Sequence, residues 1–304
     1  MRRILSIDGG GLRGSLIACF LLAVESQLGK LCREIFDMVA GTSTGALIAA
    51  AVAAGVPAAR ILGIYRDRSK EIFPFPATGL RGWAERGEKG YAYDPKVVRK
   101  ILVEEFGAAS AWLINDSPIR MLLTAKGVDQ HPWYFVQDRP KNAKVTGACP
   151  MVDCAVASAM APTYFPPWYV PPGEQLVGWC FDGGTGVAGN PVLEACIEAF
   201  EYDDFDPKDT LAASFGTGYY PDGERNPPGD GLLGAITWTI DSLVEAPIDQ
   251  QIRVAKLLYP GVVQRYNWKL PANVDMSDVA EVPTWIALGT KLAAEVDWRK
   301  ELKL

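Results

Sequence analysis

The stretch "RRILSIDGGGLRGSLIACFLLAVESQLG", residues 2–29, decides the fold class of this chain. Residues 2–7 form a short apolar run, and three glycines follow at positions 9–11. A long and nearly continuous apolar segment comes next and closes with Gly29. This order predicts a strand, a tight loop and a buried helix.

The same pattern returns within the first sixty residues. Phe36–Ala40 predicts a second strand, and the alanine-rich Thr44–Ala54 predicts a second helix that Gly55 and Pro57 end. Two such strand–loop–helix units predict an α/β fold with a mostly parallel sheet and helices on its faces. Right-handed crossovers place both loops at the carboxyl edge of that sheet.

The remaining chain continues this alternation without a clear domain boundary. Further helices are predicted at residues 57–72, 94–106, 152–161, 190–200 and 231–258, with a break near 246–247, and further strands within 120–138, at 176–181 and at 210–218. We expect a single domain over residues 1–304, with 221–304 as its C-terminal helical part. Residues 73–93, rich in glycine, proline and aromatic residues, predict an irregular insert, either a lid at the rim of a site or a plain surface loop.

Composition and charge narrow the function class. The chain has 304 residues and a net charge of −6, which argues against binding to a nucleic acid polymer. Its six cysteines contain no C-x-x-C pair and it has one histidine, so we expect no metal and no cofactor. The scattered cysteines favour buried thiols, and the apolar run Ser15–Val24 is too short to span a bilayer. We therefore expect a soluble, cytoplasmic protein.

Residues 41–45, "GTSTG", match the G-x-S-x-G pattern between a predicted strand and a predicted helix. In that context the pattern is typical of a nucleophile elbow, a strained turn that exposes the serine oxygen at the sheet edge. Gly41 and Gly45 supply room for the close approach of neighbouring backbone. The alternative is an ordinary serine or threonine cap of a helix, with Ser43 in no catalytic role.

A nucleophilic serine needs a base. The single histidine, His131, precedes Pro132, which favours extended backbone. Asp182 is the carboxylate candidate, since it follows an apolar strand and precedes Gly183 and Gly184. Burial would raise its pKa, and a direct hydrogen bond would shorten the path of the proton. Either His131 completes a triad or a carboxylate is the base, while a simple Asp-Gly hairpin turn is the structural alternative for Asp182.

Gly9, Gly11 and Gly14 match the spacing of a dinucleotide-binding loop. That loop requires a carboxylate at the end of the second strand, whereas Asp37 lies at the beginning of the strand predicted here. Glycine amides before a helix also suit the oxyanion of an acyl-transfer reaction. The position of Ser43 favours acyl transfer, although a nucleotide-binding oxidoreductase stays an alternative that tight cofactor binding would support.

Three motifs in order resemble those of the patatin-like phospholipases: "DGGGLRG" at 8–14, "GTSTG" at 41–45 and "DGG" at 182–184. The segments "ASAMAPTYFPP" at 157–167 and "SFGTG" at 214–218 are similar to further parts of that family. The resemblance implies a three-layer α/β/α fold and a Ser-Asp dyad.

The resemblance, which covers about residues 1–220, also implies a role for each matched residue. Ser43 would be the nucleophile and Asp182 the proton acceptor, and His131 would be dispensable. The oxyanion hole would comprise Gly9, Gly10 and Gly11, with Arg13 ordering their loop. The supporting glycines of the three motifs are Gly14, Gly41, Gly45, Gly183 and Gly184.

The resemblance further implies a lipid acyl hydrolase of the phospholipase A or non-specific carboxylic-ester type. Alternatives are a lipid transacylase, a cyclic-nucleotide-activated phospholipase of bacterial antiviral defence, and a lipid-binding protein without turnover. We expect an acyl-lipid substrate and a peripheral, transient membrane contact, and a homodimer stays open. Residues 164–179, rich in aromatics and prolines, would line an acyl pocket, touch a membrane interface or form a rigid structural loop.

Overall fold

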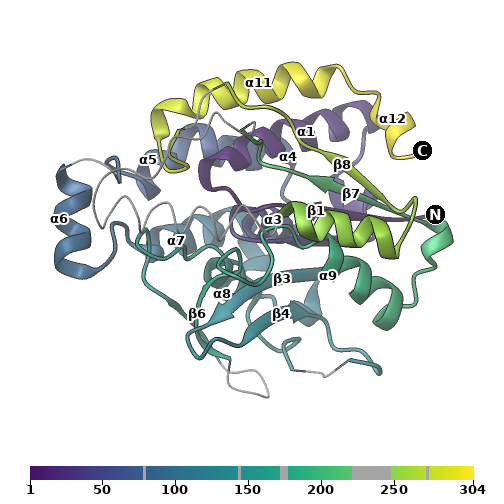
Figure 1. The fold of residues 1–304 in the computed structure, drawn as a ribbon, viewed down its shortest axis with the longest axis horizontal. Coiled ribbons are helices and arrows are strands. Elements are labelled where there is room, and N and C mark those ends of the chain that lie inside the picture. The colour runs from purple at the N-terminus through teal and green to yellow at the C-terminus, as the bar shows by residue number, and fades with distance from the viewer. Residues whose placement is uncertain (78–79, 143–144, 172–176, 221–247, 272–273) are drawn as a thin grey trace.

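A computed structural model describes residues 1–304 apart from five gaps, at 78–79, 143–144, 172–176, 221–247 and 272–273 (Figure 1). In the described residues, eight strands form one sheet in the order β5-β6-β3-β2-β1-β7-β8, with β4 also paired to β3. The strands are β1 (Arg2–Ile7), β2 (Met38–Gly41), β3 (Arg120–Gly127), β4 (Pro132–Val136), β5 (Trp168–Val170), β6 (Gly178–Asp182), β7 (Thr210–Phe215) and β8 (Val263–Tyr266).

The middle of the sheet is parallel, as predicted. Strand β1 pairs in parallel with β2 and with β7, and the pairs β2–β3 and β7–β8 are parallel too. Ile7, the last residue of β1, lies between Gly41 of β2 and Phe215 of β7. Three loops therefore leave the sheet at neighbouring points of one edge. The antiparallel strand β6 ends at that edge as well, since Asp182 pairs with Ala125 of β3.

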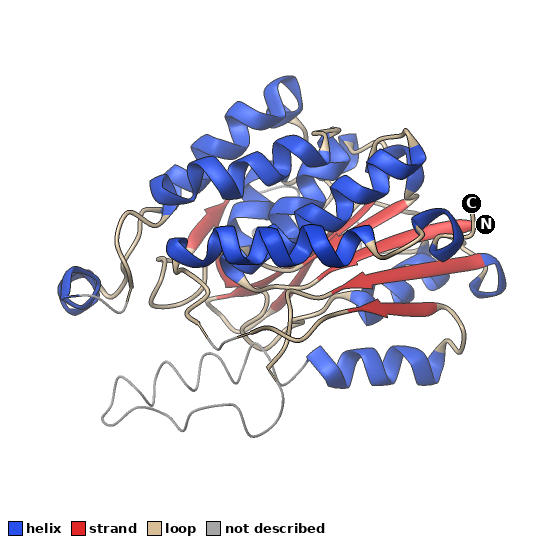
Figure 2. Ribbon diagram, turned by 90° about the horizontal axis from the view of Figure 1, so that it is seen from above, coloured by secondary structure: helices blue, strands red, loops and turns tan. Residues whose placement is uncertain are grey.

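Helices cover both faces of the sheet and complete the expected three-layer α/β/α architecture (Figure 2). The larger core includes residues of α1 (Gly14–Leu28), α3 (Thr44–Ala54) and α11 (Val282–Ala294). A second, smaller core contains residues of α9 (Val192–Ile197) and of a helix over 248–258. The six cysteines are buried and free, as predicted.

Several of the remaining helical elements were not predicted from the sequence. They are η1 (Gly11–Arg13), α2 (Cys32–Ile35), α4 (Ala58–Gly63), η2 (Ile64–Arg68), α5 (Ser69–Ile72), α6 (Leu80–Lys89), α7 (Pro95–Phe106), η3 (Gly107–Ala111), η4 (Ile114–Asp116), α8 (Met151–Ser158), η5 (Glu198–Tyr202), η6 (Pro207–Asp209), η7 (Val279–Glu281) and α12 (Trp298–Glu301). The helix predicted at 57–72 is in three pieces, because the five residues of η2 are π-helical.

Three expectations need correction. The insert at 73–93 is not wholly irregular, because it contains α6, which lies at one end of the molecule (Figure 1). The C-terminal part is not only helical, because it supplies the edge strand β8; the predicted helix over 231–247 lies outside the described residues. The first apolar helix is longer than the run judged too short for a bilayer. Over 11–28 it is long and apolar enough to span one, yet 61% of this stretch is buried inside the fold.

Candidate active site

Ser43 lies in the turn between β2 and α3 and has strained backbone. Its φ and ψ angles are 57° and −128°, a region that non-glycine residues rarely adopt. A Cβ on Gly41 would lie 2.2 Å from the carbonyl oxygen of Gly45, and one on Gly45 would lie 2.3 Å from that of Ile7. The packing of this turn therefore requires both glycines of the G-x-S-x-G pattern and exposes the serine side chain at the sheet edge.

Asp182, the last residue of β6, meets this serine from the antiparallel part of the sheet. Its side chain is 3% exposed, and burial raises its pKa from 3.8 to about 7. The Ser43 side chain and the Gly184 N–H, which donates to Oδ1 at 2.7 Å, both lower this pKa and so oppose the rise. The structure therefore brings together the serine and the carboxylate that the sequence singled out, with a carboxylate that is more basic than usual.

Ser158 joins the serine turn to the aspartate turn. It is fully buried at the end of α8, and its Oγ accepts a hydrogen bond of 2.9 Å from the Ser43 N–H. Its carbonyl oxygen lies 3.4 Å from the Gly183 nitrogen and accepts that N–H, while the carbonyl of Met160 accepts the Asp182 N–H at 3.0 Å. The sequence reasoning gave Ser158 no role, although the "ASAMAP" segment contained the signal.

The glycine loop passes directly beside the serine. A Cβ on Gly9 would lie 3.1 Å from the Ser43 Cβ, so this glycine allows close approach of the two loops. The Gly9 N–H already donates to the carbonyl of Gly189 at 3.0 Å. Among the described residues, the N–H groups of Gly10 and Gly11 donate to no backbone carbonyl. Of the three amides predicted to stabilise an oxyanion, that of Gly9 is already used within the fold, and those of Gly10 and Gly11 remain as candidates.

Arg13 orders this loop from within. Its Nε donates to the Gly10 carbonyl at 3.3 Å, and its guanidinium lies 5.9 Å from the ring centre of Tyr220. The Thr217 hydroxyl donates to the Gly9 carbonyl at 2.7 Å. Residues of the C-terminal third therefore hold the loop in place, a contribution that the motifs did not reveal.

A buried polar cluster lies under the start of the same loop. The guanidinium of Arg265, on β8, pairs with both carboxylate oxygens of Asp8, and the shorter contact is 2.5 Å. The Asn190 side chain donates to Asp8 at 2.6 Å and to the Ser214 hydroxyl at 2.9 Å. The Asp8 charge, directly before Gly9, is therefore neutralised by a partner 257 residues away in sequence.

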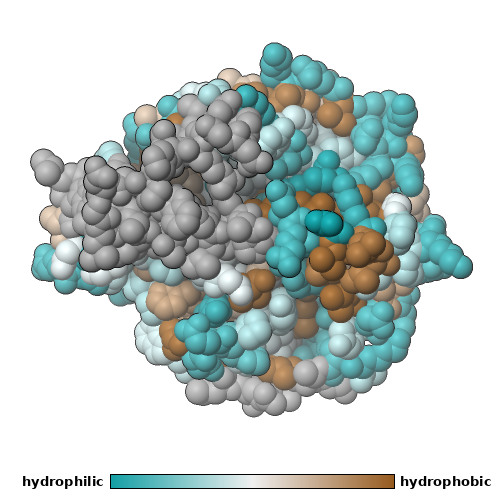
Figure 3. Space-filling model, viewed as in Figure 1, coloured by the Kyte–Doolittle hydropathy of each residue, from teal (hydrophilic) through white to brown (hydrophobic). Residues whose placement is uncertain are grey.

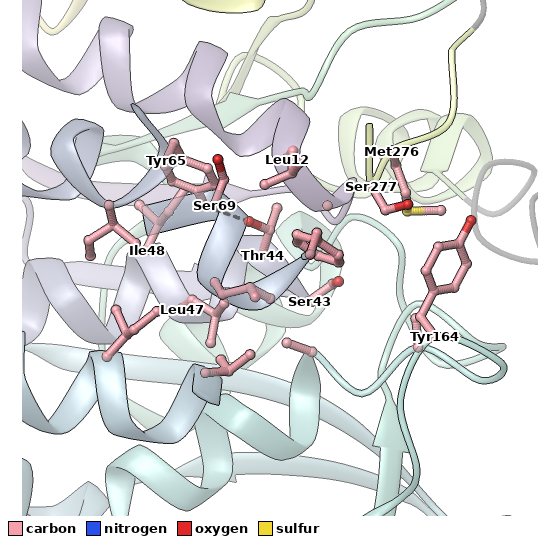
Figure 4. Close-up of a pocket in the computed structure, with 18 of the residues that line it drawn as sticks. Leu12, Ser43, Thr44, Leu47, Ile48, Tyr65, Ser69, Tyr164, Met276 and Ser277 are labelled. Atoms are coloured by element: carbon pink, nitrogen blue, oxygen red, sulfur yellow. Dashed lines mark hydrogen bonds between the residues drawn. The ribbon is translucent and has the colours of Figure 1, made fainter. Parts of the chain in front are cut away.

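An apolar cavity opens beside the serine. Figure 4 shows Ser43, Tyr164, Met276 and Ser277 at one end of it, with Ile48 and Tyr65 toward the other. The cavity has a volume of about 90 Å³. The full lining is Gly11, Leu12, Ser43, Thr44, Leu47, Ile48, Ala51, Ile61, Ile64, Tyr65, Ser69, Ile72, Phe73, Val98, Ile101, Leu102, Ala159, Ala161, Tyr164, Phe165, Met276 and Ser277.

The other candidates of the sequence lie away from this arrangement or support it. His131 is exposed in the turn between β3 and β4, where its ring contacts Trp133 at 4.7 Å between centres. Gly14 leaves room for Tyr65, whose hydroxyl would lie 2.5 Å from a Cβ there. A Cβ on Gly183 would meet the Thr124 hydroxyl at 2.1 Å. In the described part of the chain, no three His, Cys, Asp or Glu side chains gather as a metal site would require.

Comparison with known proteins gives three informative relatives. The chain is 28% identical over 253 residues to a cGAMP-activated phospholipase of Escherichia coli (strain TW11681), which covers 78% of this chain and 67% of the relative. It is 31% identical over 217 residues to Patatin-like protein 2 of Arabidopsis thaliana, covering 64% and 52%. It is 29% identical to the 85/88 kDa calcium-independent phospholipase A2 of Rattus norvegicus, covering 66% and 24%.

The chain thus spans between about a quarter and two thirds of the length of these relatives. A family model described as patatin-like phospholipase matches residues 5–196, a range that contains the serine turn, the aspartate turn and the glycine loop. Because that range is well over half of the chain, the resemblance predicted from the motifs is confirmed, and this protein belongs to the patatin-like phospholipase family.

Proposed function

We propose that this protein is a serine acyl hydrolase of the phospholipase A type, with Ser43 as nucleophile and Asp182 as its base. Membership of the family supports a lipid ester hydrolase in general. The observation that carries the finer proposal is that the turn of Ser43 and the turn of the buried Asp182 meet at Ser158, with the Asp182 pKa raised by burial to about 7 and lowered in part by the Ser43 side chain. A base of that pKa suits general-base catalysis at neutral pH.

The reaction would proceed in two halves. Asp182 takes the proton of the Ser43 hydroxyl while Oγ bonds to the ester carbonyl carbon, and the amides of Gly10 and Gly11 donate to the resulting oxyanion. Collapse of this intermediate breaks the ester C–O bond, and Asp182 returns the proton to the departing alcohol. In the second half Asp182 removes a proton from water while the oxygen of that water bonds to the acyl carbon. The bond between that carbon and Ser43 Oγ then breaks, Asp182 returns the proton to Oγ, and the fatty acid leaves.

The surroundings of the dyad fit an acyl-lipid substrate. The cavity beside Ser43 is lined almost wholly by aliphatic and aromatic side chains, which favours an acyl chain over a polar ligand. Apolar side chains also reach the surface, as at the end of the 248–258 helix, where Leu257 is 77% and Leu258 56% exposed (Figure 3). Such exposed groups support a peripheral membrane contact by a protein of the cytoplasm.

The direct test is a fluorophosphonate probe combined with product analysis on defined phospholipids and short-chain esters. Wild-type protein should be labelled at Ser43 and release free fatty acid, and Ser43→Ala should do neither while it keeps its circular dichroism spectrum. Full activity in Ser43→Ala would overturn the dyad. Added lipid alcohols that take up the acyl group in place of water would assign a transacylase instead.

Activation by a cyclic dinucleotide is a second candidate. Two relatives support it: the Escherichia coli protein and a cGAMP-activated phospholipase of Vibrio cholerae, 30% identical over 213 residues. Hydrolysis of phospholipid vesicles should then rise when cGAMP is added at micromolar concentration. An unchanged rate, with no cGAMP binding by calorimetry, would assign the chain to the constitutively active hydrolases.

A further inference from the structure

The apolar cavity follows helix α3 away from the reactive serine. Ser43, Leu47 and Ala51 all line it, and residues four apart lie one above the other on a helix face. A helix rises 1.5 Å per residue, so the cavity accompanies about 12 Å of α3 between Ser43 and Ala51. The cavity therefore extends along α3 toward Ala51, with Ser43 at its opening.

Two further helical segments form the opposite walls. Ile61 and Ile64 come from α4 and η2, and Ile101 and Leu102 come from α7. Ala51, Ile61 and Leu102 are 2%, 2% and 4% exposed, so the inner part of the cavity is sealed from solvent.

Ion pairs hold these two walls together on the outside. Arg60, next to Ile61, pairs with Glu105 at 2.7 Å. Arg68, at the end of η2, pairs with Glu104 at 2.6 Å. Both glutamates belong to α7, so two ion pairs link the segment from α4 to η2 with α7 on the other side of the cavity. These ion pairs oppose the separation of the two walls that a longer acyl chain would require.

We propose, on the basis of the proposed function, that Ala51 and Leu102 form the end of an acyl tunnel that selects chains of about ten carbons. In extended backbone three bonds span 3.3–3.6 Å, so a saturated chain advances about 1.2 Å per bond. A length of about 12 Å then accommodates about ten carbons from the ester carbonyl. The buried side chains of Ala51 and Leu102, 2% and 4% exposed, close the far end of this space.

The test compares hydrolysis of 4-nitrophenyl esters with saturated acyl chains of four to eighteen carbons. The wild-type rate should be greatest near ten carbons. Ala51→Leu adds side-chain carbons at the end of the tunnel and should move the optimum to shorter chains, lowering the ratio of C10 to C4 rates about tenfold or more. Leu102→Ala should move it to longer chains. Ala54→Leu is the matched control, since Ala54 lies on the same helix and does not line the cavity.

The outcomes separate this inference from the proposed function. Ser43-dependent hydrolysis with the same chain-length profile in wild type, Ala51→Leu and Leu102→Ala would overturn the tunnel and leave the hydrolase in place. A wild-type optimum at four or at eighteen carbons would do the same. Absence of Ser43-dependent hydrolysis with every ester would overturn the function itself. Should Ala51→Leu fail to fold, the opposite shift in Leu102→Ala decides.

Discussion

Two aspartates at the carboxyl edge of the sheet are almost equally buried, but they have different hydrogen-bond and charge partners. Asp8 is 1% exposed and Asp182 3% exposed. Asp8 receives both arms of the Arg265 guanidinium and the amide of Asn190. The Asp182 side chain accepts the Gly184 N–H, and no cation among the described residues lowers its pKa.

Under the proposed function, this difference separates a structural carboxylate, Asp8, from the catalytic base, Asp182. Burial raises the pKa of Asp8 as well, but there the Arg265 guanidinium opposes the rise, and the ion pair fixes the start of the glycine loop. A buried carboxylate without a counter-charge binds a proton more tightly, which makes it a better base. Burial raises the pKa of both carboxylates, so what distinguishes the proposed base Asp182 is that no cation is among the causes of its pKa shift.

The largest expected effect comes from Asp182→Asn. It removes the base, so kcat should fall about 10⁴-fold or more, by analogy with the loss of a base in other serine hydrolases. Because the substitution also removes an unpaired buried charge, Tm at pH 8 should stay level or rise. Ester hydrolysis and differential scanning calorimetry measure the two effects. Substantial activity in a folded Asp182→Asn protein would contradict the role of this residue.

Arg265→Met should show the reverse pattern. It leaves the Asp8 carboxylate buried without its counter-ion, and breaking a buried pair in this way costs about 3–5 kcal/mol of unfolding free energy. Urea denaturation measures that loss. The double variant Asp8→Asn with Arg265→Met should recover part of it, because no unpaired charge remains. Equal stabilities of the single and double variants would show that the ion pair is not the source of the loss.

The sequence predicted which residues meet at the carboxyl edge of the sheet and little of what supports them. Ser43, Asp182 and the glycines lie in short motifs, and the residues adjacent in sequence determine the turns that these motifs form. Arg265 acts on the start of the glycine loop from β8, and Thr217 acts on it from the loop after β7. Both lie far along the chain, and local patterns carry no information on such pairings. The Gly9 amide was predicted as a donor, but only the structure shows that Gly189 accepts it.

The helix α6 shows a second limit of local reasoning. Residues 73–93 contain four glycines and two prolines, which favours a loop, yet ten of these residues form a helix. Arg86 of this helix donates to the Thr163 carbonyl at 3.2 Å and lies over the Tyr164 ring at 4.9 Å. Such tertiary contacts override weak local preferences, and they bring α6 to Tyr164 at the mouth of the cavity.

Ser158→Ala should have an intermediate effect on the reactive side of the comparison. It removes the acceptor of the Ser43 N–H, and a small misplacement of the nucleophile should lower kcat about 10- to 100-fold. KM should change little, because Ser158 does not line the cavity. Ser69, which lines the cavity, gives a control, since Ser69→Ala should affect KM more than kcat. An unchanged kcat in Ser158→Ala would assign it a packing role alone.

The smallest effect, a tenfold change per pH unit, is also the one that tests the two aspartates most directly. Asp182 acts as a base only when ionised, so kcat/KM should fall tenfold per unit below its pKa of about 7 and level off above it. Stability should move the other way. Between the unfolded value near 3.8 and the folded value near 7, the native state holds more protons, so Asp182 lowers the free energy of unfolding as pH rises. Glu194 and Glu198, with pKa values raised by burial to about 7, add to that slope. The difference between wild type and Asp182→Asn isolates the part due to Asp182, and parallel stability profiles of the two proteins would place its folded pKa near the ordinary value.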